Sequence, residues 1–419
     1  MKYYNLMLRI VLVVLLICLG VVAFYQYALP QAPEQKPKTE HDREKVKRNK
    51  NISDYELARS KWGRPTIHKP EKAYKGYTLF CSTHDELRAG EKAHIYLVDM
   101  KGRIHHRWEV DTSVQLAKLQ PDGSLFYITR DRTAIKRAGL RRLSPDSEVQ
   151  WYYHCRSDHD FRVLDNGNFL IHCIRDGMVP ALGPELKRNP YIIEITDSKK
   201  LVWEWHGENH VQELVERLGL DWSKMKEKHK DEAADFDWAH NNTVAVIPEN
   251  ASGEKDPRFE KGNLLFSYRR LSVVGVIDRE SGEIVWAWGN GEIEGQHDVQ
   301  MLPNGHLLMF DNGRDFNPPE RGWSRVVEVD PLEEEVVWEY HGSPKESFYS
   351  GAISGVQKLP NGNIFICSGN ERRLFEVTED KEIVWEYKPP FEIKGTMGIY
   401  QATRYSPEYV RKALGKDSQ

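Results

Sequence analysis

Most of the chain alternates short apolar runs with polar turns. A representative stretch, GQHDVQMLPNGHLLMFDNG at residues 295–313, contains an alternating segment entered by His297, a Pro-Asn-Gly turn and a continuous apolar segment. Short runs of this kind, bounded by Gly, Pro and Asn, predict β-strands joined by tight turns. The frame recurs as VQLAKLQPDGSLFYIT from Val114, DHDFRVLDNGNFLIHC from Asp158 and SGVQKLPNGNIFICSG from Ser354. A repeated β unit is therefore expected.

A tryptophan-bearing segment follows each of these units. Its copies read RIHHRWEV, EVQWYYH, KLVWEWHG, EIVWAWG, EVVWEYHG and EIVWEYKPP. The anchoring residues are Trp108, Trp151, Trp203, Trp286, Trp338 and Trp385. They are 43, 52, 83, 52 and 47 residues apart, which apart from one long gap is close to the length of a propeller blade. Six four-stranded units predict an all-β, six-bladed β-propeller with these indoles packed in its core.

The two ends of the repeat predict how the ring closes. The first unit, which begins at Thr78, lacks the strand that enters the other units, and GIYQATRY at residues 398–405 is a strand left over. Pairing this C-terminal strand with the first blade would close the ring and leave no free sheet edge there. We therefore expect the propeller to span residues 73–408, followed by a C-terminal tail at 409–419.

The N-terminal residues differ from the repeat. Residues 1–29 contain the apolar run Ile10–Phe24, long enough to cross a bilayer, and predict an uncleaved signal anchor with one transmembrane helix. Residues 30–72 are charged and poor in apolar side chains, as in a linker. Basic residues follow the span, which favours a cytoplasmic domain, whereas large domains after a first anchor are often exported. We expect a single-pass, membrane-anchored protein with a periplasmic domain.

The long gap between tryptophans contains an insertion at residues 207–237. Its apolar residues recur at the spacing of one helical face, which predicts a surface helix. These residues are Val211, Leu214, Val215 and Leu218. Because the insertion leads directly into DFDWAHNNTV, two placements are open: a lid over one mouth of the channel, or a loop without that function.

Composition excludes some classes of function. Lys and Arg number 59 against 63 Asp and Glu, for a formal net charge of -4, so the basic face that nucleic acid requires is not expected. The cysteines lack zinc-site spacing. Four cysteines follow the anchor and could form up to two disulfides in an exported domain, or be small buried strand residues. They are Cys81, Cys155, Cys173 and Cys367.

The repeat places reactive side chains at one recurring position. Because the first strand of each propeller blade lines the central channel, equivalent residues of those strands converge there. By the repeat frame this ring contains Gln115, His159, His240, His297 and Ser354. Donors and cations expected beside it are Asn242, Arg269 and Arg325. Imidazoles, an amide and guanidinium groups favour a bound tetrahedral oxyanion over a sugar or a hard metal ion.

Neighbouring residues complete this set. Asp160 and Asp298 each follow a ring histidine, and strand alternation should turn them to the other face, where they would orient neighbours. Asn312 in the Asp-Asn-Gly loop is expected to form a turn and to contact substrate. Gln115 and Ser354 are further expected substrate contacts. Neither a metal ion nor a cofactor is expected in the ring.

Several motifs together resemble the bacterial arylsulfate sulfotransferase family. In order over roughly residues 158–330, they are WAHNNTV, LLFSYRRLSVVGVID, SGEIVWAWG, GQHDVQML and LLMFDNG followed by Ser-Arg. The resemblance implies a six-bladed propeller that takes a sulfuryl group from an aryl sulfate onto a histidine and passes it to a phenol. It also implies that phosphoadenosine phosphosulfate is not needed.

Matched residue by residue, the resemblance implies that His297 is the nucleophile. The other matches are His240 and Asn242 to a His-x-Asn pair, Arg269 to a Ser-x-Arg motif, His159 to a further site histidine and Arg325 to a Ser-Arg pair. Where the best-known members of the family have an extra N-terminal β domain, a membrane span and a spacer are expected here instead. The sequence also has Asp298 where a small or hydroxyl residue would be expected.

Sulfuryl transfer fits these residues, because its loose transition state spreads charge over oxygens that cations and donors stabilise. Two other functions stay open at this point. The histidines could bind a transition metal for redox or hydrolytic chemistry. Alternatively, a propeller without catalytic activity could bind a sulfated ligand or a protein partner. The oligomeric state also stays open.

Overall fold

The computed structural model describes residues 63–82, 87, 90–130, 135–221, 236–314, 321–390 and 398–415. The expected signal anchor at residues 1–29 and most of the expected linker lie outside these residues. Within the described ranges, no helix is long and apolar enough to cross a membrane.

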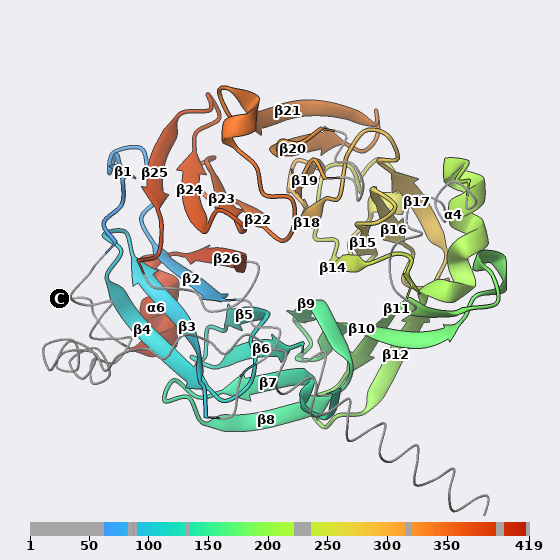
Figure 1. Cartoon of the computed structure of the whole chain (residues 1–419), viewed down its shortest axis with the longest axis horizontal. Coiled ribbons are helices and arrows are strands. Elements are labelled where there is room, and N and C mark those ends of the chain that lie inside the picture. The colour runs from blue at the N-terminus through green and yellow to red at the C-terminus, as the bar shows by residue number, and fades with distance from the viewer. Residues whose placement is uncertain are drawn as a thin grey trace, which may run out of the picture. The chain divides into compact units, whose positions relative to one another are not determined.

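Six antiparallel sheets stand around a common centre, which confirms the six-bladed propeller (Figure 1). Blade 1 contains β26 (Ile399–Tyr405), β2 (Tyr77–Ser82), β3 (Ala93–Asp99) and β4 (Ile104–Val110). Blade 2 contains β5 (Leu116–Leu119), β6 (Leu125–Thr129), β7 (Gly139–Leu143) and β8 (Val149–His154). Blade 3 contains β9 (Ser157–Val163), β10 (Phe169–Met178), β11 (Leu186–Ile195) and β12 (Leu201–His206), with β13 (Phe236–Asp237) beside β11.

The remaining blades follow the same order from channel to rim. Blade 4 contains β14 (Asn241–Val246), β15 (Leu264–Tyr268), β16 (Val273–Ile277) and β17 (Ile284–Trp288). Blade 5 contains β18 (His297–Met301), β19 (Leu307–Asp311), β20 (Arg325–Asp330) and β21 (Glu335–His341). Blade 6 contains β22 (Gly355–Lys358), β23 (Ile364–Ser368), β24 (Arg373–Val377) and β25 (Ile383–Tyr387). Short 3-10 turns lie at Ile135–Arg137, Pro180–Leu182, Gly207–His210, Pro257–Phe259 and Lys345–Ser347.

Both ends of the described chain join the ring. β26 pairs with β2, with Tyr405 opposite Tyr77, so the C-terminal strand closes blade 1 as expected. A short N-terminal strand, β1 (Ile67–His68), pairs with the outer edge of β25 in blade 6. These two residues fall within the stretch expected to be linker. Helix α6 (Pro407–Leu414) buries Val410 and Ala413 in the hydrophobic cluster shared by blades 1 and 2.

Tryptophans of the outer strands join neighbouring blades. In five blades an indole Nε1 donates a hydrogen bond to the turn between the third and fourth strands of the next blade, which pairs the polar atom of the ring. The pairs are Trp151 to Asp197, Trp205 to Gly282, Trp286 to Glu334, Trp338 to Glu379 and Trp385 to Met100, at 2.8–3.1 Å. In blade 3 this hydrogen bond comes from Trp205, although Trp203 holds the strand position of the other four donors, directly before the irregularity in strand pairing.

This difference predicts unequal effects of two substitutions in one strand. Trp205 is buried and Trp203 is partly exposed. We expect Trp205→Ala to lower the free energy of unfolding by about 3–5 kcal/mol, because a buried indole and its hydrogen bond are lost. The matched control Trp203→Ala should lower it by about 1 kcal/mol. Urea unfolding followed by fluorescence measures both, and equal losses would contradict the Trp205 assignment.

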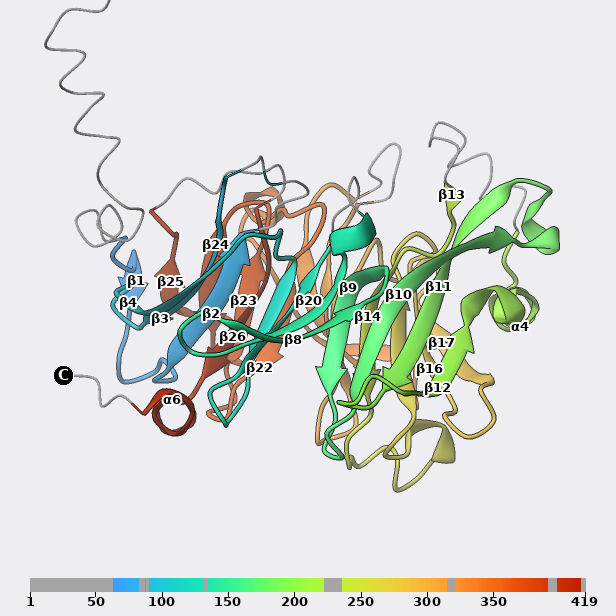
Figure 2. The ribbon, with the colours of Figure 1, turned by 90° about the horizontal axis from the view of Figure 1, so that it is seen from below.

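The described part of the insertion lies at the rim of the ring. Helix α4 (Val211–Leu218) forms as expected, with Val211 and Leu214 buried. Its Glu213 accepts a hydrogen bond from the backbone N–H of Ile284 in β17, and the helix lies on the outer side of blade 4 (Figures 1 and 2). The helix is therefore not a lid over the channel. Figure 2 shows β13, which ends the insertion, at the face of the ring opposite α6.

Candidate active site

Hydrogen bonds between blades reveal which residues occupy equivalent positions around the channel. They run from Val244 N to Asp160 Oδ2 at 3.1 Å, from Val299 N to Thr243 Oγ1 at 3.3 Å and from Val356 N to Asp298 Oδ2 at 2.9 Å. The residues that precede these three acceptors are thus equivalent: His159, Asn242 and His297. Asn242, and not His240, holds the ring position of blade 4, which corrects the repeat frame. Asp160 and Asp298 orient neighbouring strands, as strand alternation predicted.

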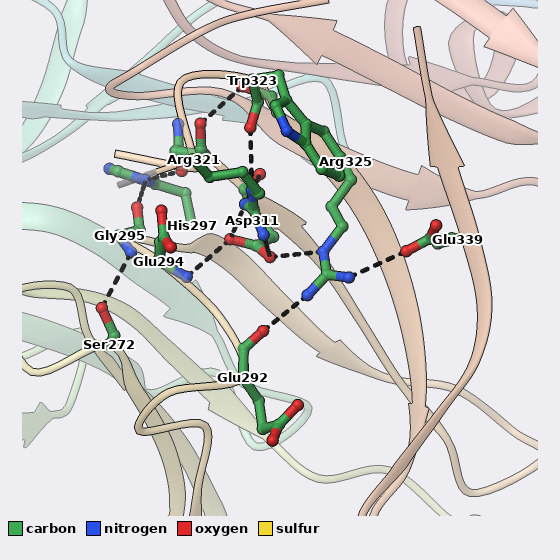
Figure 3. Close-up of polar contacts among 12 residues, drawn as sticks. Ser272, Glu292, Glu294, Gly295, His297, Asp311, Arg321, Trp323, Arg325 and Glu339 are labelled. Atoms are coloured by element: carbon green, nitrogen blue, oxygen red, sulfur yellow. Dashed lines mark hydrogen bonds and ion pairs between the residues drawn. The ribbon is translucent and has the colours of Figure 1, made fainter. Parts of the chain in front are cut away.

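His297 begins β18, just before an irregularity in its pairing with β19. Its side chain is buried, and its Nδ1 faces two oxygen atoms, the Asn312 side-chain Oδ1 at 2.7 Å and the Gly295 carbonyl at 3.1 Å (Figure 3 shows His297 beside Gly295). Two acceptors at Nδ1 require the proton on that nitrogen. The other ring nitrogen, Nε2, therefore carries the lone pair.

The orientation of the Asn312 amide is set by its own partners. Its Nδ2 donates to the carbonyl oxygens of Ser350 at 2.6 Å and Ile353 at 2.9 Å. With the amide nitrogen bound to two acceptors, the amide oxygen must point at His297. Asn312, expected as a turn residue and substrate contact, is thus also the residue that selects the His297 tautomer.

Burial and the nearby positive charge of Arg269 keep the His297 ring neutral. Burial lowers the pKa of His297 well below its usual range, and the Arg269 guanidinium lowers it further, as do His159 and His240, against an opposing hydrogen bond with Asn312. A neutral imidazole with a free Nε2 lone pair is the nucleophilic form. The cation Arg269, at the end of β15, is close enough to His297 and His240 to affect both.

His159 is held by a buried carboxylate. Its Nδ1 lies 2.7 Å from Oδ2 of Asp158, and its backbone N–H donates to the Gln115 side chain at 3.0 Å. Asp158 also pairs with Arg130, whose Nε lies 2.5 Å from Oδ1. Although burial alone would raise it, Arg130 and His159 hold the pKa of Asp158 well below its usual range. The carboxylate therefore stays ionised and orients the His159 ring.

His240 has a carboxylate partner of its own. It lies two residues before the ring position, and its Nδ1 donates to Asp237 Oδ2 over 2.7 Å. The His159 and His240 rings meet edge to face, with centroids 4.7 Å apart. Burial lowers the pKa of His240 to about 3, although Asp237 raises it. Two Asp–His pairs thus lie side by side. Because burial also lowers the pKa of His159, both imidazoles are neutral at neutral pH.

The other expected site residues hold their neighbours in place. The Asn242 amide donates to the Gln296 carbonyl, directly before His297, at 2.7 Å. Ser354 Oγ lies 2.8 Å from Ser350 Oγ and accepts from Gly369 N at 3.1 Å. Gln115 binds the His159 backbone. Arg325 pairs with Asp311 at 2.8 Å and Glu339 at 2.9 Å (Figure 3). These contacts indicate that all four side chains position neighbouring segments of the site. Direct contact with substrate or binding of an oxyanion was expected of them from the sequence.

A comparison with known protein families bears on this site. The family model described as Arylsulfotransferase (ASST) matches residues 116–389, which is more than half of the chain. The chain belongs to the arylsulfotransferase family. Membership suggests sulfotransferase activity, with an aryl sulfate as donor and a phenol as acceptor. The three channel histidines all lie within the matched residues.

Two solved structures are similar to this chain. A protein of unknown function from Bacteroides caccae is 13% identical, with a TM-score of 0.50 over 79% of this chain and 98% of that chain. Virginiamycin B lyase from Staphylococcus aureus is 10% identical, with a TM-score of 0.42 over 81% of this chain and 95% of that chain. At such low identity the likeness shows the fold alone. No curated protein matches the chain.

Sequence reasoning missed four residues at this site. They are Arg130, Asp158, Asp237 and Tyr400. Asp158 could have been noticed because it precedes His159 directly, and Asp237 because it lies three residues before His240. Tyr400 comes from the closing strand β26, and its ring lies 5.9 Å from that of His159. Its buried hydroxyl has no hydrogen-bond partner among the residues that the structure describes.

Among the described residues, one group of side chains could hold a metal ion. Asp158, His159 and His172 offer ligand atoms within 4.8 Å of one another, and all three are buried. His172 donates from Nδ1 to the Asp158 carbonyl at 2.8 Å, which leaves its Nε2 as an acceptor. However, the Asp158 carboxylate already binds Arg130, a cation that a metal ion would repel. The four described cysteines form no disulfide, and none of them belongs to this group.

The buried imidazole of His172 should make the free energy of unfolding of this protein sensitive to acid. Burial lowers its pKa from 6.5 to about 4, so below pH 6.5 the unfolded imidazole takes up a proton that the folded one does not. This stabilisation is complete above pH 6.5 and is lost as pH falls toward 4, by up to roughly 3 kcal/mol. Between neutral pH and about pH 4.5, the free energy of unfolding measured with urea should fall less for His172→Asn than for the wild type. Equal losses would contradict a neutral, buried His172.

Proposed function

We propose that this chain transfers a sulfuryl group from a phenolic sulfate ester to a phenol through a sulfohistidine on His297, without phosphoadenosine phosphosulfate. One observation carries the proposal: the Asn312 and Gly295 oxygens hold the Nδ1 proton of His297, so the lone pair is on Nε2, within a channel that Arg269 makes more positive. A fixed tautomer removes the need for a separate base in the first step.

In the first half-reaction, Nε2 of His297 forms a bond to sulfur as the bond between sulfur and the phenolic oxygen breaks. The imidazole becomes cationic, and the two oxygens at Nδ1 stabilise it. Arg269 is placed to balance the charge on the sulfuryl oxygens, and this kind of preorganised stabilisation supplies most of the catalysis in related phosphoryl transfers. In the second half-reaction, a phenol oxygen attacks sulfur and the bond to Nε2 breaks.

The Asp–His pairs supply the proton. His159 and His240 are neutral in the free protein, and a bound sulfate ester would add a negative charge that raises their pKa. A protonated His240, with its charge balanced by Asp237, would donate to the departing phenolate and recover the proton from the incoming phenol. His159, held by Asp158 on the neighbouring blade, is the second candidate donor.

The test is mass spectrometry after a brief incubation with a chromogenic aryl sulfate and no acceptor. We expect acid-labile sulfation on the peptide that contains His297 and a burst of one phenolate per protein. Turnover with the label on another residue would overturn the assignment of the nucleophile. Saturable binding of the ester with no phenolate release would favour a propeller that only binds sulfated ligands.

A metal-dependent enzyme is the second candidate, favoured by the Asp158, His159 and His172 group. Elemental analysis of purified protein distinguishes the two. Stoichiometric metal, with activity lost to a chelator and restored by metal, would replace sulfuryl transfer as proposed here. We expect activity to persist in the chelator, because the ion pair of Asp158 with Arg130 occupies the carboxylate.

We also propose that residues 1–29 anchor the protein in a membrane with the propeller in the periplasm. The uninterrupted apolar run Ile10–Phe24 supports the anchor. Fractionation of cells followed by protease treatment of spheroplasts tests both parts. Recovery of the protein in the soluble fraction would refute the anchor, and protection from protease would place the propeller in the cytoplasm.

A further inference from the structure

A buried carboxylate lies beside the His297 loop without contacting His297 itself. Asp311 is fully buried at the end of β19 and binds groups from three segments (Figure 3). Its oxygens accept from the Glu294 backbone N–H at 2.8 Å, from the Arg321 guanidinium at 2.7 and 2.8 Å and from Arg325 Nε at 2.8 Å. We name Asp311, Arg321, Arg325 and Glu339 the Asp311 clamp.

We propose that the Asp311 clamp positions the two oxygen atoms that select the tautomer of His297. Glu294 directly precedes Gly295, whose carbonyl accepts from His297 Nδ1, and Asp311 directly precedes Asn312, the second acceptor. One carboxylate thus connects the segments that carry both acceptors. A second bond, from Gly313 N to the Glu294 carbonyl at 3.0 Å, joins the same two segments.

The arginines extend this connection to the rest of blade 5. Arg325 donates to the Glu292 carbonyl at 2.7 Å and pairs with Glu339 of β21 at 2.9 Å (Figure 3). Arg321 donates to the Trp323 carbonyl at 3.1 Å. Two guanidinium groups and two carboxylates balance in charge, so the clamp fixes geometry while adding no net charge near the channel. This inference rests on the proposed function, because it assigns positioning residues to the same nucleophile.

Arg325→Met is the informative variant. It removes the contacts to Glu292, Glu339 and Asp311 together, but leaves Asp311 paired with Arg321. Its matched control is Arg373→Met in blade 6, where Arg373 also begins the third strand and pairs with a glutamate, Glu386, at 2.6 Å. Both substitutions remove an arginine from the same place in a blade, but only Arg325 is linked to the His297 loop.

The first measurement is the tautomer of His297, read by nitrogen-15 NMR of histidine-labelled protein without substrate and assigned with His297→Asn. We expect the Nδ1–H form in the wild type and in Arg373→Met, and a mixture of both tautomers in Arg325→Met. The second measurement is the phenolate burst with an aryl sulfate. It should slow by roughly 10–100-fold in Arg325→Met, as for other residues that orient a reactive histidine, while KM for the ester changes little.

Arg325→Lys gives a milder test, because it keeps a cation near Asp311 but cannot reach all three partners; its tautomer ratio should lie between those of the wild type and Arg325→Met. A wild-type tautomer in Arg325→Met, or the same change in Arg373→Met, would overturn the inference. The tautomer is measured without turnover. If the wild type transfers no sulfuryl group, the proposed function fails, and the NMR comparison still decides whether the clamp positions His297.

Discussion

Replacing His297 by alanine is expected to abolish sulfuryl transfer, with a loss of about 10⁴–10⁶-fold in kcat. Such losses are typical when the covalent nucleophile of a two-step enzyme is removed, because neither half-reaction can then proceed through the intermediate. Arg269, His159 and His240 remain in the variant, so the sulfate ester should still bind. Steady-state release of phenolate measures the first effect, and equilibrium titration with the ester measures the second.

The matched control is His306→Ala. His306 directly precedes β19, at the opposite end of that strand from Asn312, and pairs with Glu328 at 2.8 Å. Its loss should leave kcat unchanged. Activity that survives in His297→Ala at more than a few per cent of wild type would show that another group accepts the sulfuryl.

Replacing Asn312 by leucine is expected to lower the burst rate by about 10²–10⁴-fold. In the variant, only the Gly295 carbonyl remains to accept from the Nδ1 proton of His297. Nε2 would then carry the proton in a large fraction of molecules. In serine proteases, loss of the group that fixes the histidine tautomer costs about 10⁴ in kcat. The remaining Gly295 acceptor should make the loss smaller here.

Asn312→Leu also leaves the Ser350 and Ile353 carbonyls unpaired, so a loss of stability must be separated from a loss of chemistry. Asn363→Leu in blade 6 is the control, because the Asn363 amide donates to the Lys72 carbonyl and to Glu376, far from the histidines. Both variants should lower Tm to a similar extent. Only Asn312→Leu should slow the burst, and parallel changes in rate would refute a tautomer function for Asn312.

Local sequence pattern was sufficient for the architecture. Alternation of apolar and polar residues, Gly-containing turns and recurring tryptophans depend on neighbours a few residues apart, and they predicted six four-stranded blades and the closing strand β26. The convergence of His159 and His297 also followed, because equal places in a repeated strand must meet at the axis. The motifs around these residues indicated the family that the comparison then showed.

The repeat frame failed where the blades deviate from regularity. In blade 4 the long connection between β14 and β15, residues 247–263, replaces the short turn from which the frame is counted in other blades, and the position expected for His240 is taken by Asn242. In blade 3 the alternation alone could not distinguish Trp203 from Trp205 as the indole that donates to the next blade, because both rings contact that blade. A shift of one or two residues moves a side chain to another place in the sheet, and such shifts depend on neighbouring strands.

Composition and pattern alone therefore established which groups this protein brings to its channel: three imidazoles, an amide and arginines on a six-bladed ring. What each group does there depended on contacts between residues far apart in the chain. The Nδ1 proton of His297 is set by Asn312, which is oriented by Ser350 and Ile353, and Arg325 is drawn from the expected anion site to Asp311 and Glu339. Hydrogen-bond direction and ion pairing are properties of three-dimensional neighbours, and the order of residues along a strand does not contain them.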